Sequence, residues 1–290
     1  MDVFFFGLGY SSLATARWIH RLVDPDVPIS GTVRTEAKAA RLRQEGIRAH
    51  VFDGKRSSLT AGPEIRSATH VIHSIPPPGP ADPVLAHHRA DLDAAKNLEW
   101  LGYFSTVGVY GDAGGKWIDE SAPIHPINAR SLHRIDAENL WRHYANSRGL
   151  PLTILRLAGI YGPGRSAFDK LREGTARRIV KPGQVFNRIH VEDIGRATAL
   201  AAHRRLDGIF NLADDEPAPP QDLVEHAAKL IGVAIPNAID FSAAELTPMA
   251  NSFYSDNKRC ANAAIKAALG IDLLYPNYRE GLAAILEADA

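Results

Sequence analysis

The sequence predicts an α/β protein with a doubly wound parallel sheet and a smaller, mostly helical lobe near its carboxyl end. Apolar runs of strand length alternate with helical patterns through the first two thirds of the chain, and this alternation stops after about residue 160. The chain has 290 residues, of which 45% are hydrophobic. This size and composition are sufficient for a substantial core.

Six runs are expected to form buried strands because they are short, apolar and rich in β-branched and aromatic residues. They are VFFFG (3–7), PISGTV (28–33), RAHVFD (48–53), HVIHSI (70–75), WLGYFS (100–105) and LTILRLAGI (152–160). Between them, apolar residues recur at helical spacing, and a helix over 36–46 is expected to end at Gly46. A proline-rich loop over 74–83 follows the fourth strand.

Composition excludes several classes of function. Lys plus Arg equals Asp plus Glu at 33 each, so no overall field attracts nucleic acid or an anionic membrane. The single cysteine, Cys260, permits no internal disulfide, and with an opening segment unlike a signal peptide it indicates a cytoplasmic protein. The sequence contains neither a metal-ligand pattern nor a G-x-S-x-G nucleophile elbow, so no metal site is expected.

The stretch FFFGLGYSS predicts a dinucleotide-binding turn of the Rossmann type. A tight turn needs Gly7, and close approach of the backbone to a pyrophosphate needs Gly9. The third position of the pattern is Ser12 instead of Gly or Ala, which adds a hydroxyl. Tyr10, Ser11 and Ser12 begin a helix whose amides are expected to face the phosphates. The expected cofactor contacts in this stretch are Gly7, Gly9, Tyr10, Ser11 and Ser12.

Arg34 follows the second strand, where an acidic residue would indicate a preference for NAD. A guanidinium pairs well with a 2′-phosphate, so NADP is the expected cofactor, with NAD as the alternative. Lys38 lies one helical turn further and adds a charge, although a solvated lysine on a helix surface is an equally good interpretation. Residues 1–163, completed by about 186–214, are expected to form this Rossmann core. The substrate lobe is then expected over 164–185 and 215–290.

Several motifs follow one another along nearly the whole chain: GLGYSS, HVIHSIP, STVGVYGD, DESAPIHP, ILRLAGIYGPGR, RIHVEDIGRA, FNLADDEP and NKRCANAAIKAALG. This ordered set resembles the extended short-chain dehydrogenase/reductase family, which includes NAD-dependent epimerases and dehydratases of nucleotide sugars. The resemblance implies that Thr106 hydrogen bonds a reacting carbonyl and that His73, Ser74 and Leu157 contact the cofactor. It also implies a small-molecule substrate, with sugar nucleotides as one candidate, and a homodimer.

The family's proton-transferring tyrosine and the lysine four residues later are missing at the expected place. Alignment of RSLHRIDAE places Arg130 at the tyrosine position and Arg134 at the lysine position. A guanidinium effectively never loses its proton, so Arg130 cannot replace the phenol, whereas Arg134 can still donate to ribose or phosphate oxygens. Tyr110 and His133 are candidates for a relocated acid or base, with structural roles favoured for both.

Two hypotheses remain open from the sequence. The first is an NADP-dependent oxidoreductase or epimerase-like enzyme that uses a proton donor other than the usual tyrosine. The second is a protein that binds NADP(H) without turnover and acts as a sensor or regulator, because the sequence supplies no standard proton route.

Overall fold

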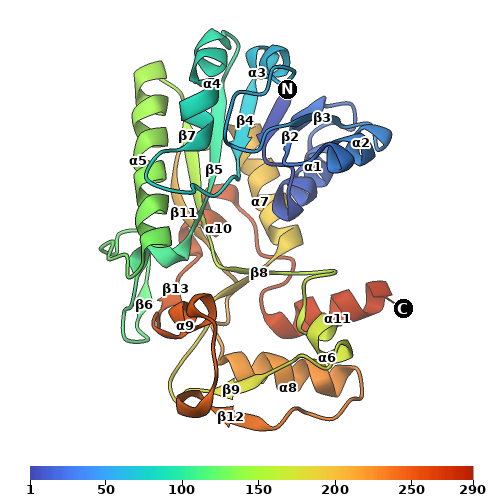
Figure 1. Ribbon diagram of the computed structural model, residues 1–290, viewed down its shortest axis with the longest axis vertical. Coiled ribbons are helices and arrows are strands. Elements are labelled where there is room, and N and C mark those ends of the chain that lie inside the picture. Colours follow the sequence, from blue (N-terminus) through green and yellow to red (C-terminus); the bar gives the residue numbers. More distant parts are fainter. Residues whose placement is uncertain (290) are drawn as a thin grey trace. The chain divides into compact units, whose positions relative to one another are not determined.

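A computed structural model describes residues 1–289 (Figure 1). Its main element is a seven-stranded parallel sheet with the strand order β11-β7-β5-β4-β1-β2-β3. This confirms the predicted doubly wound α/β fold. The strands are β1 (Val3–Phe6), β2 (Ile29–Val33), β3 (Arg48–Val51), β4 (His70–His73), β5 (Trp100–Thr106), β7 (Leu152–Leu157) and β11 (Gly208–Leu212).

Helices cover both faces of this sheet (Figure 1). On one face, side chains from α3, α4 and α5 pack with Phe4, Phe6 and Leu101 in a buried apolar cluster. On the other face α7 crosses α1 closely, since a β-carbon at Gly195 would lie 2.6 Å from the ring of Trp18. The helices are α1 (Tyr10–Leu22), α2 (Glu36–Gln44), α3 (Gly62–Ser67), α4 (Pro83–Ala94), α5 (Ala129–Arg148) and α7 (Val191–Arg204).

The strand order reverses between β1 and β4, which places their carboxyl ends side by side. In the register of this parallel pair, Phe6 lies opposite His73, and the amide of Ser74 donates to the carbonyl of Phe6 at 2.9 Å. The next residue after β1 is Gly7, so Gly7 and Ser74 meet at the point where the order reverses. In open α/β sheets, ligands bind at this edge.

The chain divides into two compact units. The first comprises residues 1–106, 129–156 and 194–210 and contains most of the large sheet, and the second comprises 107–128, 157–193 and 211–290. The smaller elements are η1 (Val107–Tyr110), β6 (Trp117–Ile118), β8 (Gly159–Tyr161), α6 (Ala167–Arg172), β9 (Arg178–Val180), β10 (Arg188–His190), α8 (Pro220–Leu230), β12 (Ala238–Asp240), η2 (Phe241–Ala243), α9 (Pro248–Tyr254), β13 (Arg259–Cys260), α10 (Ala263–Leu269) and α11 (Tyr278–Asp289).

The second unit has its own core and three two-stranded sheets. Its core includes Tyr161, Phe168, Tyr278, Leu282 and Ile285.

None of the helices within residues 1–289 combines the length and apolarity needed to cross a bilayer.

The apolar run at 152–160 forms two strands instead of the single one expected. The amide of Ala158 still donates to Leu212 at 3.0 Å, but the amide of Gly159 donates to Asn187 at 3.0 Å, beside β10. The chain therefore leaves the large sheet after Leu157. This change of partner coincides with a boundary between the two units, because residues 157–193 belong to the second unit.

Candidate cofactor and active site

The loop from β1 to α1 forms a tight turn at Gly7. This residue has a φ of +97°, and a β-carbon on it would lie 2.7 Å from Oγ of Ser74. Its amide donates to Oγ1 of Thr32 at 3.0 Å, and the hydroxyl of Ser74 donates to its carbonyl at 2.7 Å. Glycine alone adopts this conformation without strain, so side chains from β2 and from the end of β4 fix the turn predicted here.

The amino end of α1 is open to a ligand. Gly9 is its N-cap, with no side chain capping the helix and no acidic residue in the first turn. Among the described residues other than its chain neighbours, no atom lies within 4 Å of a β-carbon built on Gly9, which leaves space beside the start of the helix. A helix amino end with room for an anion suits a pyrophosphate, and the residues present therefore fit a dinucleotide.

Ser12 has a structural role at the third position of the glycine pattern. Its side chain is 1% exposed, and its hydroxyl donates to Oγ of Ser74 at 3.1 Å. Because Ser74 in turn donates to Gly7, the serine joins α1 to the turn and to the end of β4. Ser11 is also buried, whereas Tyr10 is half-buried at the start of the helix.

Two basic side chains lie just beyond β2. Arg34 is exposed, and Lys38 is half-buried in the first turn of α2. Burial, followed by the nearby charges of Arg41 and Arg34, lowers the pKa of Lys38. Among residues 1–289 neither Arg34 nor Lys38 has a carboxylate partner, so both charges remain available to an anion.

A buried network holds the carboxyl end of β5, where Thr106 is half-buried. The hydroxyl of the preceding Ser105 donates to the carboxylate of Glu138 on α5. The same carboxylate accepts two hydrogen bonds from Arg156 on β7, at 2.8 and 3.2 Å. All members of this network are at most 4% exposed, so α5 and β7 together fix the backbone that leads into Thr106.

Arg134 lies on α5 beside the same strand. Its Nη1 donates to the hydroxyl of Tyr103 at 3.0 Å and to the carbonyl of Phe104 at 2.9 Å. Arg130, one helical turn earlier, is exposed. Burial raises the pKa of Tyr103 well above its ordinary value, although the charge of Arg134 opposes the shift.

The model of the NAD-dependent epimerase/dehydratase family matches residues 88–213. Residues 88–213 therefore resemble this family, and the doubly wound sheet agrees with that resemblance. This resemblance supports a nicotinamide cofactor.

The chain is also similar to individual proteins. A conserved protein of unknown function from Silicibacter pomeroyi DSS is 43% identical, with a TM-score of 0.86 over 100% of this chain and 99% of its own. A 3-diazoavenalumate denitrifying reductase from Streptomyces sp is 26% identical over 85% of this chain and 71% of its own. UDP-glucuronic acid 4-epimerase from Bacillus cereus, solved with NAD, is 17% identical and shares the fold, with a TM-score of 0.74 over 99% of this chain and 98% of its own.

The structure brings most of the predicted turn residues together. The side chains of His73 and Tyr110 instead contact Asp82 and Asn211. Gly7, Gly9, Ser12 and Ser74 form one connected group. The side chain of His73 is 0% exposed, and its Nε2 lies 2.8 Å from Oδ2 of Asp82, so a cofactor contact by this ring stays unsupported.

Tyr110 and Leu157 belong to the second unit. The hydroxyl of Tyr110 donates to Oδ1 of Asn211 at 2.7 Å, and the residue is 3% exposed. A buried, hydrogen-bonded phenol is a poor proton donor to a substrate, so its interpretation as an acid becomes weaker. Leu157 is 6% exposed, at the end of β7.

Sequence reasoning missed Tyr103, Glu138 and Arg156. A signal was present, because Tyr103 and Ser105 alternate along a strand that is otherwise apolar and therefore point to the same face. Polar groups on the buried face of a strand need partners. The identity of those partners, on α5 and β7, could not be read from the pattern.

The second unit contains a buried polar group of its own. Asp214 is 1% exposed, and neither oxygen of its carboxyl group has a hydrogen-bond partner among the described residues. Burial raises the pKa of Asp214 to about 8, and the charge of Arg188 opposes the shift. Nε2 of His190 is also buried without a partner there, and burial lowers the pKa of this ring to about 4.

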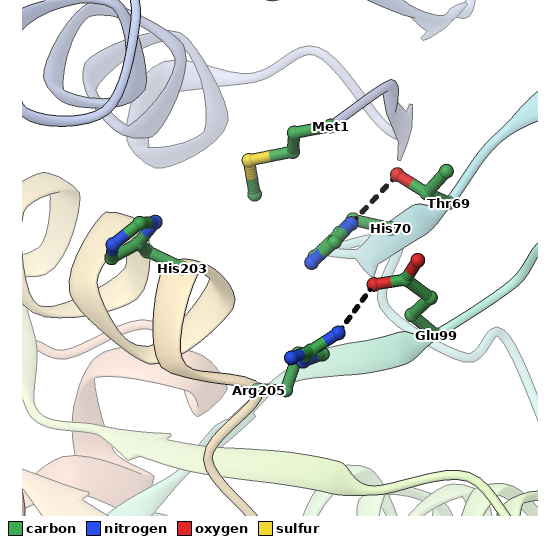
Figure 2. A pocket seen from close by; sticks show the side chains of 6 residues that line it. All are labelled: Met1, Thr69, His70, Glu99, His203 and Arg205. Atoms are coloured by element: carbon green, nitrogen blue, oxygen red, sulfur yellow. Dashed lines mark hydrogen bonds and ion pairs between the residues drawn. The ribbon is translucent and has the colours of Figure 1, made fainter.

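A cavity of about 210 Å³ opens at the opposite edge of the large sheet (Figure 2). Its lining comes from residues at the amino ends of strands and at the end of α7: Met1, Thr69, His70, Glu99, His203 and Arg205. Glu99 and Arg205 form an ion pair of 2.7 Å, and burial lowers the pKa of His70 to about 4. The cavity therefore lies away from the turn at Gly7, and its one carboxylate and one guanidinium are paired with each other.

Within residues 1–289 no group of His, Cys, Asp and Glu side chains is arranged to hold a metal ion.

Proposed function

We propose that the chain is an NADP(H)-dependent oxidoreductase, or an epimerase-like enzyme, that works without the Tyr-x-x-x-Lys dyad of its family. The observation that carries the proposal is the uncapped amino end of α1 beside Gly9, with open space for a pyrophosphate. A reduced nicotinamide supplies a hydride, so the protein has to bind the cofactor and orient an acceptor.

Arg34 and Lys38 support NADP over NAD. A 2′-phosphate would carry its charge into the space beside the second strand, and both side chains lack a protein carboxylate among the described residues. An acidic residue at position 34 would instead accept the two ribose hydroxyls of NAD. The charge pattern therefore favours the phosphorylated cofactor.

At the reacting end, Thr106 polarises a carbonyl and Arg134 donates to oxygens of the cofactor or substrate. Arg130 supplies a second positive charge on the same helix, one turn away. Neither guanidinium transfers a proton, so the proton comes from water or from the substrate itself. The substrate is a small molecule, and sugar nucleotides are one candidate because structural neighbours were solved with UDP-glucose or UDP-glucuronic acid.

A second candidate function is binding of NADP(H) without turnover, as a sensor or regulator. It is favoured by the predicted placement of Arg130 and Arg134 at the positions where the family carries its proton-transferring dyad. Cofactor binding needs only the phosphate turn and the basic side chains, so it is independent of that loss.

Turnover stoichiometry separates the two functions. The chain is mixed with NADPH and a panel of carbonyl compounds and sugar nucleotides, and cofactor oxidation is followed at about 340 nm. Oxidation of many cofactors per chain would establish an enzyme. Tight NADPH binding with no more than one oxidation per chain across the panel would support the sensor, and absence of NADPH binding would contradict both.

A further inference from the structure

One nitrogen of the Arg134 guanidinium is hydrogen bonded to protein, and the other two have no acceptor among the described residues. Its Nη1 is occupied by the hydroxyl of Tyr103 and the carbonyl of Phe104, at 3.0 and 2.9 Å. Within the described residues its Nε and Nη2 have no acceptor. The side chain is half-buried, so these remaining N–H groups are available to a bound molecule.

Tyr103, which hydrogen bonds Nη1 of Arg134, is rigidly packed. Tyr103 is 0% exposed, and its ring lies 5.2 Å from the ring of His73 and 6.5 Å from that of Trp141. The guanidinium carbon of Arg134 lies 5.6 Å from the centre of the same tyrosine ring. A cation fixed in this way needs little reorganisation when negative charge develops beside it.

Neither this guanidinium nor the Tyr103 phenol that contacts it exchanges a proton readily near neutral pH. A guanidinium stays protonated, and burial raises the pKa of the Tyr103 phenol. The hydroxyl of Ser105 is committed to Glu138, and His133 precedes Arg134 on α5, so the two side chains point about 100° apart. This part of the first unit therefore supplies fixed positive charge.

We propose that Arg134, positioned by Tyr103, stabilises an enolate, and that the site reduces conjugated carbonyl compounds in preference to isolated ketones and aldehydes. The proposal rests on the proposed function, since it needs a nicotinamide cofactor. Hydride addition to an isolated carbonyl forms a localised alkoxide that normally takes a proton from the enzyme. Hydride addition to an enone forms a delocalised anion that a fixed cation can stabilise until water protonates it.

The reaction balances with NADPH and water as the only co-reactants. The hydride of NADPH, with its electron pair, forms the new C–H bond at the β-carbon, and NADPH is oxidised to NADP⁺. The electrons of the C=C π bond form the enolate, whose oxygen accepts from Nε and Nη2 of Arg134. Water then delivers a proton to the α-carbon, which completes reduction of the double bond, and buffer neutralises the hydroxide.

The first experiment compares cyclohexenone with cyclohexanone after NADPH binding has been measured by fluorescence. We expect kcat/KM for the enone to exceed that for the ketone by at least about tenfold, without a titrating group between about pH 6 and 9. A ketone preference, absence of enone turnover, or a rate that follows a pKa in that range would overturn the inference while leaving cofactor binding intact. Failure to bind NADPH would instead overturn the proposed function.

Substitutions on α5 test the role of the charge. Arg134→Met should lower kcat for the enone by about 100-fold or more, while Arg134→Lys keeps a charge and should stay within about tenfold of the parent. Arg142→Gln, an exposed position on the same helix, is the matched control and should change kcat little. Equal kcat values for the methionine and lysine variants would contradict an electrostatic role.

A binding measurement gives a readout that does not depend on turnover. p-Nitrophenolate is a stable delocalised anion and resembles the charge of an enolate, and p-nitrobenzyl alcohol is a neutral control. With NADP⁺ present, the parent should bind the anion about tenfold more tightly than Arg134→Met does, and the two should bind the alcohol alike. Equal affinities of both chains for the anion would overturn the inference even if the methionine variant were inactive for other reasons.

Discussion

The carboxylate of Glu138 lies 2.8 Å from Nη2 of Arg156, in a pair that is almost fully excluded from water. The pair joins α5 to β7, and Ser105 joins both to β5. Because the backbone of Ser105 leads directly into Thr106, this network is a structural support for the proposed reacting end of the site.

Removal of one partner of this pair should destabilise the chain strongly. Glu138→Gln leaves the charge of Arg156 buried and uncompensated, which costs about 3–5 kcal/mol of the free energy of unfolding in urea. The exposed pair of Glu99 and Arg205 is the control, since Glu99→Gln should cost only about 0–1 kcal/mol. Similar losses for the two variants would show that the buried charge is compensated in another way.

Two glycines of the phosphate turn should respond differently to alanine. Gly7→Ala should lower the free energy of unfolding by about 1–3 kcal/mol, because the residue has a φ of +97° and a β-carbon would meet Ser74. Gly9→Ala should leave stability nearly unchanged, since its β-carbon meets no atom within 4 Å, but should weaken NADPH binding by about tenfold or more. Thermal unfolding and fluorescence titration measure the two effects. Unchanged NADPH affinity in Gly9→Ala would exclude this approach of the pyrophosphate.

The cofactor preference should depend on Arg34. Arg34→Gln removes a guanidinium from beside the expected 2′-phosphate, and should raise Kd for NADPH by about tenfold while changing that for NADH little. Lys96→Gln removes one exposed charge elsewhere in the first unit and serves as the control. If Arg34→Gln weakened NADH and NADPH binding equally, the side chain would contact a part that the cofactors share.

Stability of the chain should depend on pH through Asp214. Burial raises the pKa of this carboxyl group from 3.8 to about 8, so between these values the folded chain holds a proton that the unfolded chain releases. The contribution of Asp214 to stability is therefore complete below about pH 4, decreases as pH rises, and is lost above about pH 8.

Asp214→Asn removes this titration. Urea unfolding gives the free energy of unfolding of the parent and of the variant at each pH. The parent's value, relative to the variant's, should fall by about 1 kcal/mol per pH unit between about pH 4 and 8. Asp26→Asn, at an exposed position, should show no such slope. A difference that rises with pH would mean that Asp214 is ionised in the folded chain.

The resemblance to the family and the tight turn at Gly7 were both accessible from the sequence, because they depend on local residue types. Gly7 forms a turn with a positive φ, as expected of a residue that a tight turn needs, and a β-carbon on Gly9 would meet no described atom within 4 Å outside its chain neighbours. The catalytic interpretation was less accessible. The buried ring of His73 and the hydrogen-bonded phenol of Tyr110 depend on partners that are distant along the chain.

By itself the sequence determined the doubly wound sheet and the order of its main strands and helices, and it led to the prediction that arginines replace the usual tyrosine and lysine at positions 130 and 134. Periodicity and turn chemistry are local properties, so residues adjacent along the chain carry them. Only the tertiary structure showed that Tyr103 and Phe104 hold one side of the Arg134 guanidinium and that Arg156 neutralises Glu138. These contacts join separate elements, and their geometry depends on how the helix packs against the sheet.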